Sequence, residues 1–349
     1  MACTIRIAAM LKPILKRSLR VLLAALGRQN RTPRRPALLI LMYHRVLPPD
    51  HTELPIIQPG MVVYPQTFNM HLRIVRERFE VVHLGDWLAR RARGQPLPKK
   101  ACAITFDDGW RDNYDHAFPL LRAAGLPATI FLVSDMVGTP DTFWPERLAR
   151  LLWNRGRGQS SAVWALTEFD WLRTLGVAYP FGERPPTRSE IDAIIQQSKR
   201  YSEAELNQKL RAMAPHIAQE EAAAVPDILD WHQVNEMAAS GLVSFGSHTR
   251  HHVRLGDALD KSLLLDEVRT SREIIEKHTN RSVELFCYPN GDYTPAVKRL
   301  VQDYYQAACT TQKGWNDLMA DSHALKRVGV HQDVAFDETS FLAKLSGWN

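Results

Sequence analysis

The 349-residue sequence has few cysteines, and none of them forms a Cys-x-x-Cys pair. Cys102, Cys287 and Cys309 lie inside apolar, strand-like runs, where a thiol usually acts as a small buried hydrophobe. This pattern argues against a disulfide framework and favours a reducing compartment. The sequence also has no phosphate-cradling glycine loop, which disfavours a phosphatase or nuclease.

Residues 1–35 lack acidic side chains but contain nine lysines and arginines. Because the whole chain has a formal net charge of +6, residues 36–349 carry −3. The basic character therefore belongs to an N-terminal arm. A nucleic-acid-binding domain would usually spread its basic side chains over a folded surface, so we expect no nucleic-acid partner.

The arm has an amphipathic pattern. Between Leu11 and Leu26 apolar residues recur at helical spacing, with Lys12, Lys16 and Arg20 on another stripe. Such a helix could lie on an anionic membrane surface, pack on the domain, or form a basic tail. Charges interrupt every window of about 20 residues, which excludes a transmembrane span. The short run Val21–Gly27 is a poor signal peptide. We therefore expect a cytoplasmic protein, with peripheral contact at the inner face of the membrane left open.

Residues 36–349 are expected to form one α/β domain, because apolar β-branched runs alternate with helical patterns. Several runs are apolar throughout, as in parallel strands covered on both faces, and the number of units predicts a (β/α) barrel. The expected strands are Leu38–Tyr43, Val81–Leu84, Cys102–Phe106, Ala128–Val133, Leu242–Phe245, Glu284–Tyr288, Gln306–Thr310 and Leu325–Val330.

Residues from about 139 to 231 interrupt the alternation and are predicted to form a mostly helical insertion. This stretch contains several tryptophans, which could stack on sugar rings or fill a small core of the insertion itself; we favour the second interpretation. They are Trp144, Trp153, Trp164 and Trp171.

Two motifs follow expected strands and contain metal-binding side chains. Asp107 and Asp108 precede a turn at Gly109, so one carboxylate could bind a metal while the other stays free as a base. His248 and His252 are four residues apart, and one helical turn could aim both at one ion. Two imidazoles and one carboxylate leave an open position for water, which is typical of a catalytic zinc site.

A third motif runs from Phe286 to Tyr293, where a strand ends in a Pro-Asn-Gly turn. Turns of this kind leave backbone N–H groups pointing outward, where they can stabilise an oxyanion. The alternative is an ordinary connection between a strand and a helix.

The ordered set Thr-Phe-Asp-Asp-Gly, Ser-His-Thr-x-x-His and Tyr-Pro-x-Gly resembles the polysaccharide deacetylases of carbohydrate esterase family 4, the NodB homology domain. The match covers roughly residues 36–335. The resemblance implies a deformed (β/α) barrel of parallel strands and a divalent metal, most readily Zn²⁺. Asp107 is similar to the catalytic base, and Asp108, His248 and His252 to the metal ligands. Asn290, through its backbone N–H, and Tyr288 correspond to the oxyanion and substrate positions.

One departure from the family pattern concerns Cys287, which stands where many members have an arginine that orients the base. The orienting contact must come from elsewhere or be missing. This departure, with the strand Leu41–Val46 that contains Tyr43 and His44, resembles the subgroup acting on poly-N-acetylglucosamine. In that subgroup the general acid comes from the N-terminal strand, which favours His44; in other members it comes from the last strand, which would be His331.

The sequence thus predicts a hydrolase that removes an N-acetyl or other N-acyl group from an amino sugar in a poly- or oligosaccharide. Two alternatives stay open. One is a deformylase or deacetylase of a lipid-linked amino sugar, and the other is a catalytically inactive glycan-binding protein.

Overall fold

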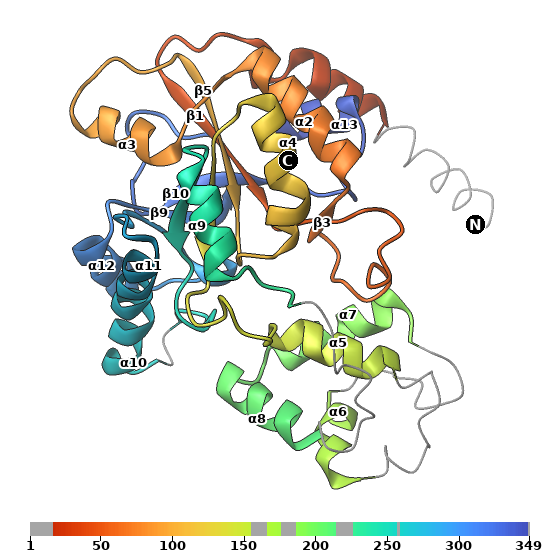
Figure 1. Ribbon diagram of the computed structural model, residues 1–349. Coiled ribbons are helices and arrows are strands. Elements are labelled where there is room, and N and C mark those ends of the chain that lie inside the picture. The colour runs from red at the N-terminus through yellow and green to blue at the C-terminus, as the bar shows by residue number, and fades with distance from the viewer. Residues whose placement is uncertain (1–16, 155–165, 176–185, 214–225, 257–258, 348–349) are drawn as a thin grey trace, which may run out of the picture. The chain divides into compact units, whose positions relative to one another are not determined.

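The computed structural model describes residues 17–154, 166–175, 186–213, 226–256 and 259–347 (Figure 1). The chain divides into two compact units. The first comprises Met1–Leu47, Val62–Gly138 and Ile228–Asn349. The second comprises Pro48–Met61 and Thr139–Asp227.

The first unit is built on a closed ring of seven parallel strands, in the order β1, β10, β9, β8, β7, β6, β5 and back to β1. β4 pairs with the first residues of β5, whereas β6 pairs with its last residues. The predicted parallel (β/α) barrel is therefore confirmed. The strands are β1 Ala37–Tyr43, β4 Glu80–Val81, β5 Lys100–Phe106, β6 Ala128–Leu132, β7 Val243–Ser247, β8 Leu285–Cys287, β9 Ala307–Lys313 and β10 Leu325–Gly329.

The register between β1 and β5 positions the site. The two strands pair in parallel without a break from Ala37–Lys100 to Tyr43–Phe106. They therefore end at the same height, and the residues that follow them emerge side by side. Both strands are buried almost throughout, since side chains fill the barrel and helices cover its outside.

Amphipathic helices surround the ring (Figure 1). In α2, for example, Phe68, Leu72 and Val75 recur at helical spacing and are buried, and Pro65 begins the helix, where its missing N–H is not needed. The helical elements that follow the N-terminal arm in this unit are α2 Pro65–Arg78, α3 Leu84–Ala92, η2 Asn113–Ala117, α4 Phe118–Ala124, α9 Trp231–Ala239, α10 Lys261–Leu265, η7 Asp266–Thr270, α11 Ser271–Thr279, η8 Pro289–Gly291, α12 Pro295–Tyr304 and α13 Glu338–Leu345. Two further strands of two residues each, β2 Arg45–Val46 and β3 Val62–Val63, pair with each other outside the ring.

The second unit is helical where it is described, with α5 Trp144–Asn154, η5 Thr167–Phe169, α6 Asp170–Arg173, α7 Arg188–Ser198 and α8 Glu203–Met213. Trp144 and Trp171 are buried in its own apolar core together with Ile56. This supports the interpretation that these tryptophans fill the core; Trp164 lies outside the described residues. Arg150 pairs with both Glu53 and Asp227, which ties Pro48–Met61 to this unit.

The described part of the N-terminal arm forms a helix over residues 17–26, followed by the turn η1 Arg28–Asn30. The earlier residues of the arm, including Lys12 and Lys16, lie outside the described residues. Within the described ranges, no helix combines the length and hydropathy needed to cross a bilayer.

Candidate active site

The residues singled out in the sequence follow the carboxyl ends of five strands of the ring. Parallel strands present these ends at one edge of the barrel, so distant parts of the chain meet there. The site residues are His44 after β1, Asp107 and Asp108 after β5, His248 and His252 after β7, Tyr288 and Asn290 after β8, and His331 after β10.

Three side chains form a group that can hold a metal ion. The ligand atoms of Asp108, His248 and His252 all lie within 4.8 Å of one another. Asp108 Oδ1 is 3.4 Å from the Nε2 atom of each histidine. Asp108 and His248 are buried, and His252 is partly exposed, so the group has an open side. One carboxylate and two imidazoles match the donor set of a catalytic zinc site.

Neighbouring groups fix the free atoms of this donor set. The Nδ1 of His248 lies 2.7 Å from the Cys287 carbonyl oxygen, to which it can donate, leaving the Nε2 lone pair for a metal. The indole N–H of Trp110 donates to Asp108 Oδ2 at 2.9 Å, which leaves Oδ1 toward the histidines. Burial lowers the pKa of His252 to about 4 despite the charge of Asp108, so its imidazole is neutral at pH 7.

The backbone around these ligands adopts an uncommon conformation. Asp108, Thr249 and His252 have φ values of 76°, 69° and 61°, in the left-handed region that non-glycine residues rarely adopt. The prediction that one helical turn aims the two histidines is therefore wrong. Residues 248–252 form an irregular loop, and two left-handed residues turn the imidazoles toward Asp108.

A fully buried carboxylate holds that loop. Glu267 in η7 accepts hydrogen bonds from the backbone N–H groups of Arg250 and His251, at 2.9 and 3.1 Å. Its other oxygen lies 2.7 Å from the Nδ1 of His251. His251 thus points away from the metal ligands, as expected from the sequence, and helps to anchor the loop that presents them. The guanidinium of Arg250 adds an ion pair with Asp135.

Arg327 supplies the orienting contact that Cys287 cannot give. Its Nη1 and Nη2 atoms donate to Asp107 Oδ1 and Oδ2, both at 2.7 Å. Arg327 is fully buried in β10, close to a shift in register with β9. Burial alone would raise the pKa of Asp107, but the charge and hydrogen bonds of Arg327 outweigh it, so the pKa lies below its usual value. Asp107 is therefore ionised at neutral pH.

Cys287 lies beside this ion pair, and its Sγ atom is 3.7 Å from both oxygens of Asp107. Asp107, His248 and Cys287 form a second group with metal-ligand spacing. Burial raises the pKa of the Cys287 thiol well above its usual value, so it is not a thiolate at neutral pH. Since both oxygens of Asp107 are also bound by Arg327, this group fits a metal worse than Asp108, His248 and His252.

The two candidate general acids differ in their surroundings. His44 Nε2 is 3.9 Å from Asp107 Oδ2, and its side chain is partly exposed. His331 instead lies 3.2 Å from Asp333 through its Nδ1 atom. Burial lowers the pKa of His331, and the Asp333 carboxylate offsets this only in part. Of the two candidate acids, His44 is therefore the one that lies near Asp107, the candidate base.

The Pro-Asn-Gly turn keeps its backbone geometry, but Tyr288 does not have the predicted role. Asn290 has φ 55°, and among the described residues its N–H donates to no other group. A side chain at Gly291 would collide with Thr311, so the turn requires glycine there. Tyr288 is fully buried and donates its hydroxyl to the His323 carbonyl oxygen at 3.1 Å. Its side chain has no surface to offer a substrate, and we correct its role to support of the turn.

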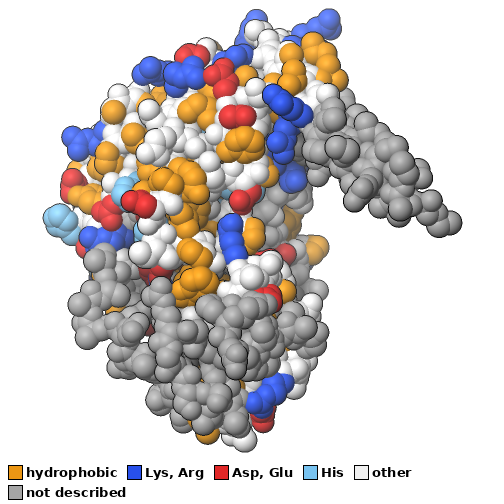
Figure 2. Space-filling view, turned by 90° about the vertical axis from the view of Figure 1, so that its right-hand side faces the viewer, with side chains coloured by type: hydrophobic (Ala, Val, Ile, Leu, Met, Phe, Trp, Pro, Cys, Tyr) orange, Lys and Arg blue, Asp and Glu red, His pale blue; other side chains and the backbone are white. Residues whose placement is uncertain are grey.

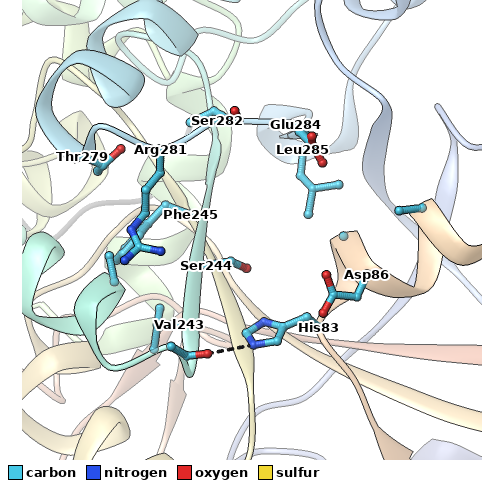
Figure 3. Close-up of a pocket in the computed structure, with 15 residues that line it drawn as sticks. His83, Asp86, Val243, Ser244, Phe245, Thr279, Arg281, Ser282, Glu284 and Leu285 are labelled. Atoms are coloured by element: carbon cyan, nitrogen blue, oxygen red, sulfur yellow. Dashed lines mark hydrogen bonds between the residues drawn. The ribbon is translucent and has the colours of Figure 1, made fainter.

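A cavity of about 470 Å³ lies at the opposite edge of the barrel (Figure 3). It is lined by the first residues of β7 and β8, Val243 and Leu285, together with polar side chains such as His83 and Asp86. None of the predicted site residues lines it. The catalytic candidates and this cavity therefore occupy different ends of the same strands.

Arg327 and Glu267 were not predicted from the sequence, although each has a signal there. In β10, Arg327 shares a face with the buried Leu325, which places a charge toward the core. Glu267 precedes Ser271 and Ile275 by four and eight residues, on the buried face of its helix. A charged residue at a core position needs a partner, so both positions could have been marked as functional.

Comparison with known proteins finds similar sequences and a similar fold. A family model described as polysaccharide deacetylase matches residues 94–158 and 203–308. A Bacillus subtilis (strain 168) protein named as a candidate polysaccharide deacetylase, YxkH, is 30% identical over 114 residues, which are 29% of this chain and 40% of that protein. The poly-beta-1,6-N-acetyl-D-glucosamine N-deacetylase of Escherichia coli K12 is 47% identical over 47 residues, 14% of this chain and 7% of that enzyme. The chain thus spans less than two thirds of these relatives.

Two solved structures share the fold. The Streptococcus pyogenes deacetylase PplD, in complex with acetate, has a TM-score of 0.56 at 17% identity, covering 89% of this chain and 99% of that one. IcaB from Ammonifex degensii has a TM-score of 0.54 at 19% identity, covering 90% and 100%. The two segments that the polysaccharide deacetylase model matches contain Asp107 and Asp108 in the first, and His248 and His252 in the second. Over the residues that the model matches, the chain resembles polysaccharide deacetylases, and its fold is the one that these solved structures share.

Proposed function

We propose that this protein removes N-acetyl groups from amino sugars in an N-acetylglucosamine polymer or oligomer, with a divalent metal as cofactor. The observation that carries the proposal is the pairing of two groups at one edge of the barrel. Asp108, His248 and His252 offer a metal-ligand set, and the ionised Asp107 lies beside them, oriented by Arg327. The E. coli relative supports an N-acetylglucosamine polymer as the substrate class.

The donor set fits a metal ion on chemical grounds. In the absence of an ion, burial lowers the pKa of His248, but the neighbouring carboxylates Asp108 and Asp107 outweigh it and raise the pKa. A cation bound there would take the place of that proton. A bound divalent ion, most readily Zn²⁺, would act as a Lewis acid toward the acetyl oxygen and lower the pKa of a coordinated water.

The chain's own residues would then perform the proton transfers. Asp107 takes a proton from the water that attacks the acetyl carbon, and Arg327 keeps the carboxylate ionised and in place for this step. The N–H of Asn290 donates to the oxygen that gains negative charge. His44 donates a proton to the sugar nitrogen as the carbon–nitrogen bond breaks, because an amine anion is a very poor leaving group. The products are acetate and the free amino sugar.

The test is a mass measurement of acyl loss on N-acetylglucosamine oligomers of differing linkage, with and without chelator. We expect loss of one acetyl mass per reacted sugar, abolished by chelation and restored by added Zn²⁺. His248→Ala should lose both activity and bound metal, measured by elemental analysis. Activity that survives complete removal of metal, or unchanged metal content in His248→Ala, would contradict the proposal.

A further inference from the structure

The helix at residues 17–26 presents an apolar face to solvent. Leu19, Leu22 and Leu26 are 52%, 52% and 59% exposed, which is high for leucine. Since each residue of an α-helix advances by about 100°, these three lie within about 60° of one another around the helix axis. They form one stripe, which we call the leucine stripe.

A different side of the helix, with Arg20, Leu23 and Ala24, is half-buried, while Val21, across the helix from the stripe, is 53% exposed. Gln29 is fully buried, where its side-chain amide donates to the carbonyl oxygens of Leu23 and Ala24 at 3.0 Å. Lys100, at the start of β5, donates to the Gln29 carbonyl oxygen at 3.0 Å. The helix is thus anchored by its C-terminal end, with the leucine stripe turned outward.

The segment that contains the stripe carries charge of one sign. Residues 17–35 contain six arginines and no acidic residue. Of these, Arg17, Arg28, Arg31, Arg34 and Arg35 are exposed. In the space-filling view, hydrophobic and basic side chains lie next to one another at the upper edge of the molecule, with some acidic side chains among them (Figure 2). Phe336, itself 46% exposed, lies beneath the guanidinium of Arg20.

From these observations we propose that the leucine stripe and its arginines form a docking surface for an anionic lipid bilayer. A bilayer interface accepts leucines into its acyl boundary while its headgroups attract the arginines. A second copy of the chain would bring six further arginines against these, which disfavours a dimer through this face. A nucleic acid would interact with the arginines but gain nothing from exposed leucines. The anionic bilayer uses both features.

The proposal is tested by sedimentation of the full-length protein with phosphatidylcholine vesicles, with and without phosphatidylglycerol. We expect binding to the anionic vesicles that weakens as salt is raised. The combined variant Leu19→Gln, Leu22→Gln and Leu26→Gln should bind about tenfold more weakly, or worse, because it keeps every charge but loses the apolar contact. Arg31→Gln, Arg34→Gln and Arg35→Gln together should reduce the preference for phosphatidylglycerol.

Leu263→Gln, an exposed leucine of α10, is the matched control and should bind as the wild type does. Three results would overturn the proposal: no sedimentation of the wild type with anionic vesicles, equal binding by the leucine variant, or binding to duplex DNA in preference to vesicles. The assay involves no deacetylation, so its outcome is independent of the proposed function.

Discussion

The two ends of the barrel strands differ in how their polar side chains are held. At the carboxyl ends, Asp107 and Asp108 are buried, and hydrogen bonds hold both oxygens of Asp107 and one of Asp108. At the amino ends, Asp86 and Arg281 line an open cavity and are exposed. Of the five described non-glycine residues with positive φ, four follow the carboxyl ends and the fifth ends α11. Backbone strain of this kind persists where the surroundings enforce it, so the carboxyl end is the preorganised one.

The largest effect is expected from Asp107→Asn. The amide cannot take a proton from water, so kcat should fall about 10³-fold or more, within the range of general-base contributions. Metal content should be unchanged, because Asp107 is outside the ligand set. The matched control at the amino end is Asp86→Asn, which should keep full activity. Wild-type rates in Asp107→Asn would show that Asp107 is not the base. Loss of activity in Asp86→Asn would show that the amino ends of the strands also contribute to activity.

His44→Ala should reduce kcat about 10²- to 10³-fold, since the leaving amine would lose its proton donor. His331→Ala should cost less than about fivefold, because His331 lies against Asp333 and not against the base. His83→Ala, at the amino end, is the neutral control. Rates should be compared under saturating metal. A severe loss in His331→Ala with an active His44→Ala would reverse the assignment.

Arg327→Met should move the acid limb of the kcat/KM profile to higher pH. The sign follows from Asp107: Arg327 lowers the pKa of a carboxyl that burial alone would raise, so without Arg327 the base takes up its proton at a higher pH. Because a buried unpaired carboxylate also destabilises the fold, Arg327→Lys serves as a second variant that keeps the charge. Its profile should shift less, and Arg281→Met should not shift it at all. An unmoved acid limb in Arg327→Met would contradict this role.

Glu267→Gln should weaken metal binding about 10- to 100-fold, as expected for groups that orient ligands. The amide has one acceptor oxygen where the carboxylate has two, so it cannot accept from both the backbone N–H groups of the ligand loop and the Nδ1–H of His251. A chelator competition measures this directly, and kcat at saturating metal should change little. Glu284→Gln at the amino end is the control. Equal metal affinity in the two variants would show that the loop holds its conformation without Glu267.

Much of the fold could be predicted because hydrophobic periodicity is a local signal. All eight expected strands have a counterpart in the structure. The expected strand Val81–Leu84 was too long, because β4 ends at Val81 and Leu84 begins α3. In that helix Leu84, Trp87 and Leu88 recur at helical spacing and are buried. The sequence did not predict that Pro48–Met61 belongs to the second unit, because its attachment there depends on an ion pair between distant residues, Glu53 and Arg150.

The motif residues of the site could be recognised because each lies in a short, ordered pattern after a strand. The partners of those residues could not. Arg327 reaches Asp107 across 220 residues of sequence, and only the closed ring, with its register, brings them together. The sequence predicted that one loop brings His248 and His252 together, but it predicted the wrong backbone conformation, since spacing alone does not distinguish a helical turn from a loop with two left-handed residues.

The pairing of Asp107 with Arg327 also bears on the order of folding. β10 is the last strand of the chain, and it completes the ring by pairing with both β1 and β9. Until β10 has left the ribosome, the ring is open and Asp107 lacks the counter-charge that makes its burial tolerable. Asp107 thus acquires its counter-charge in the same event that closes the barrel.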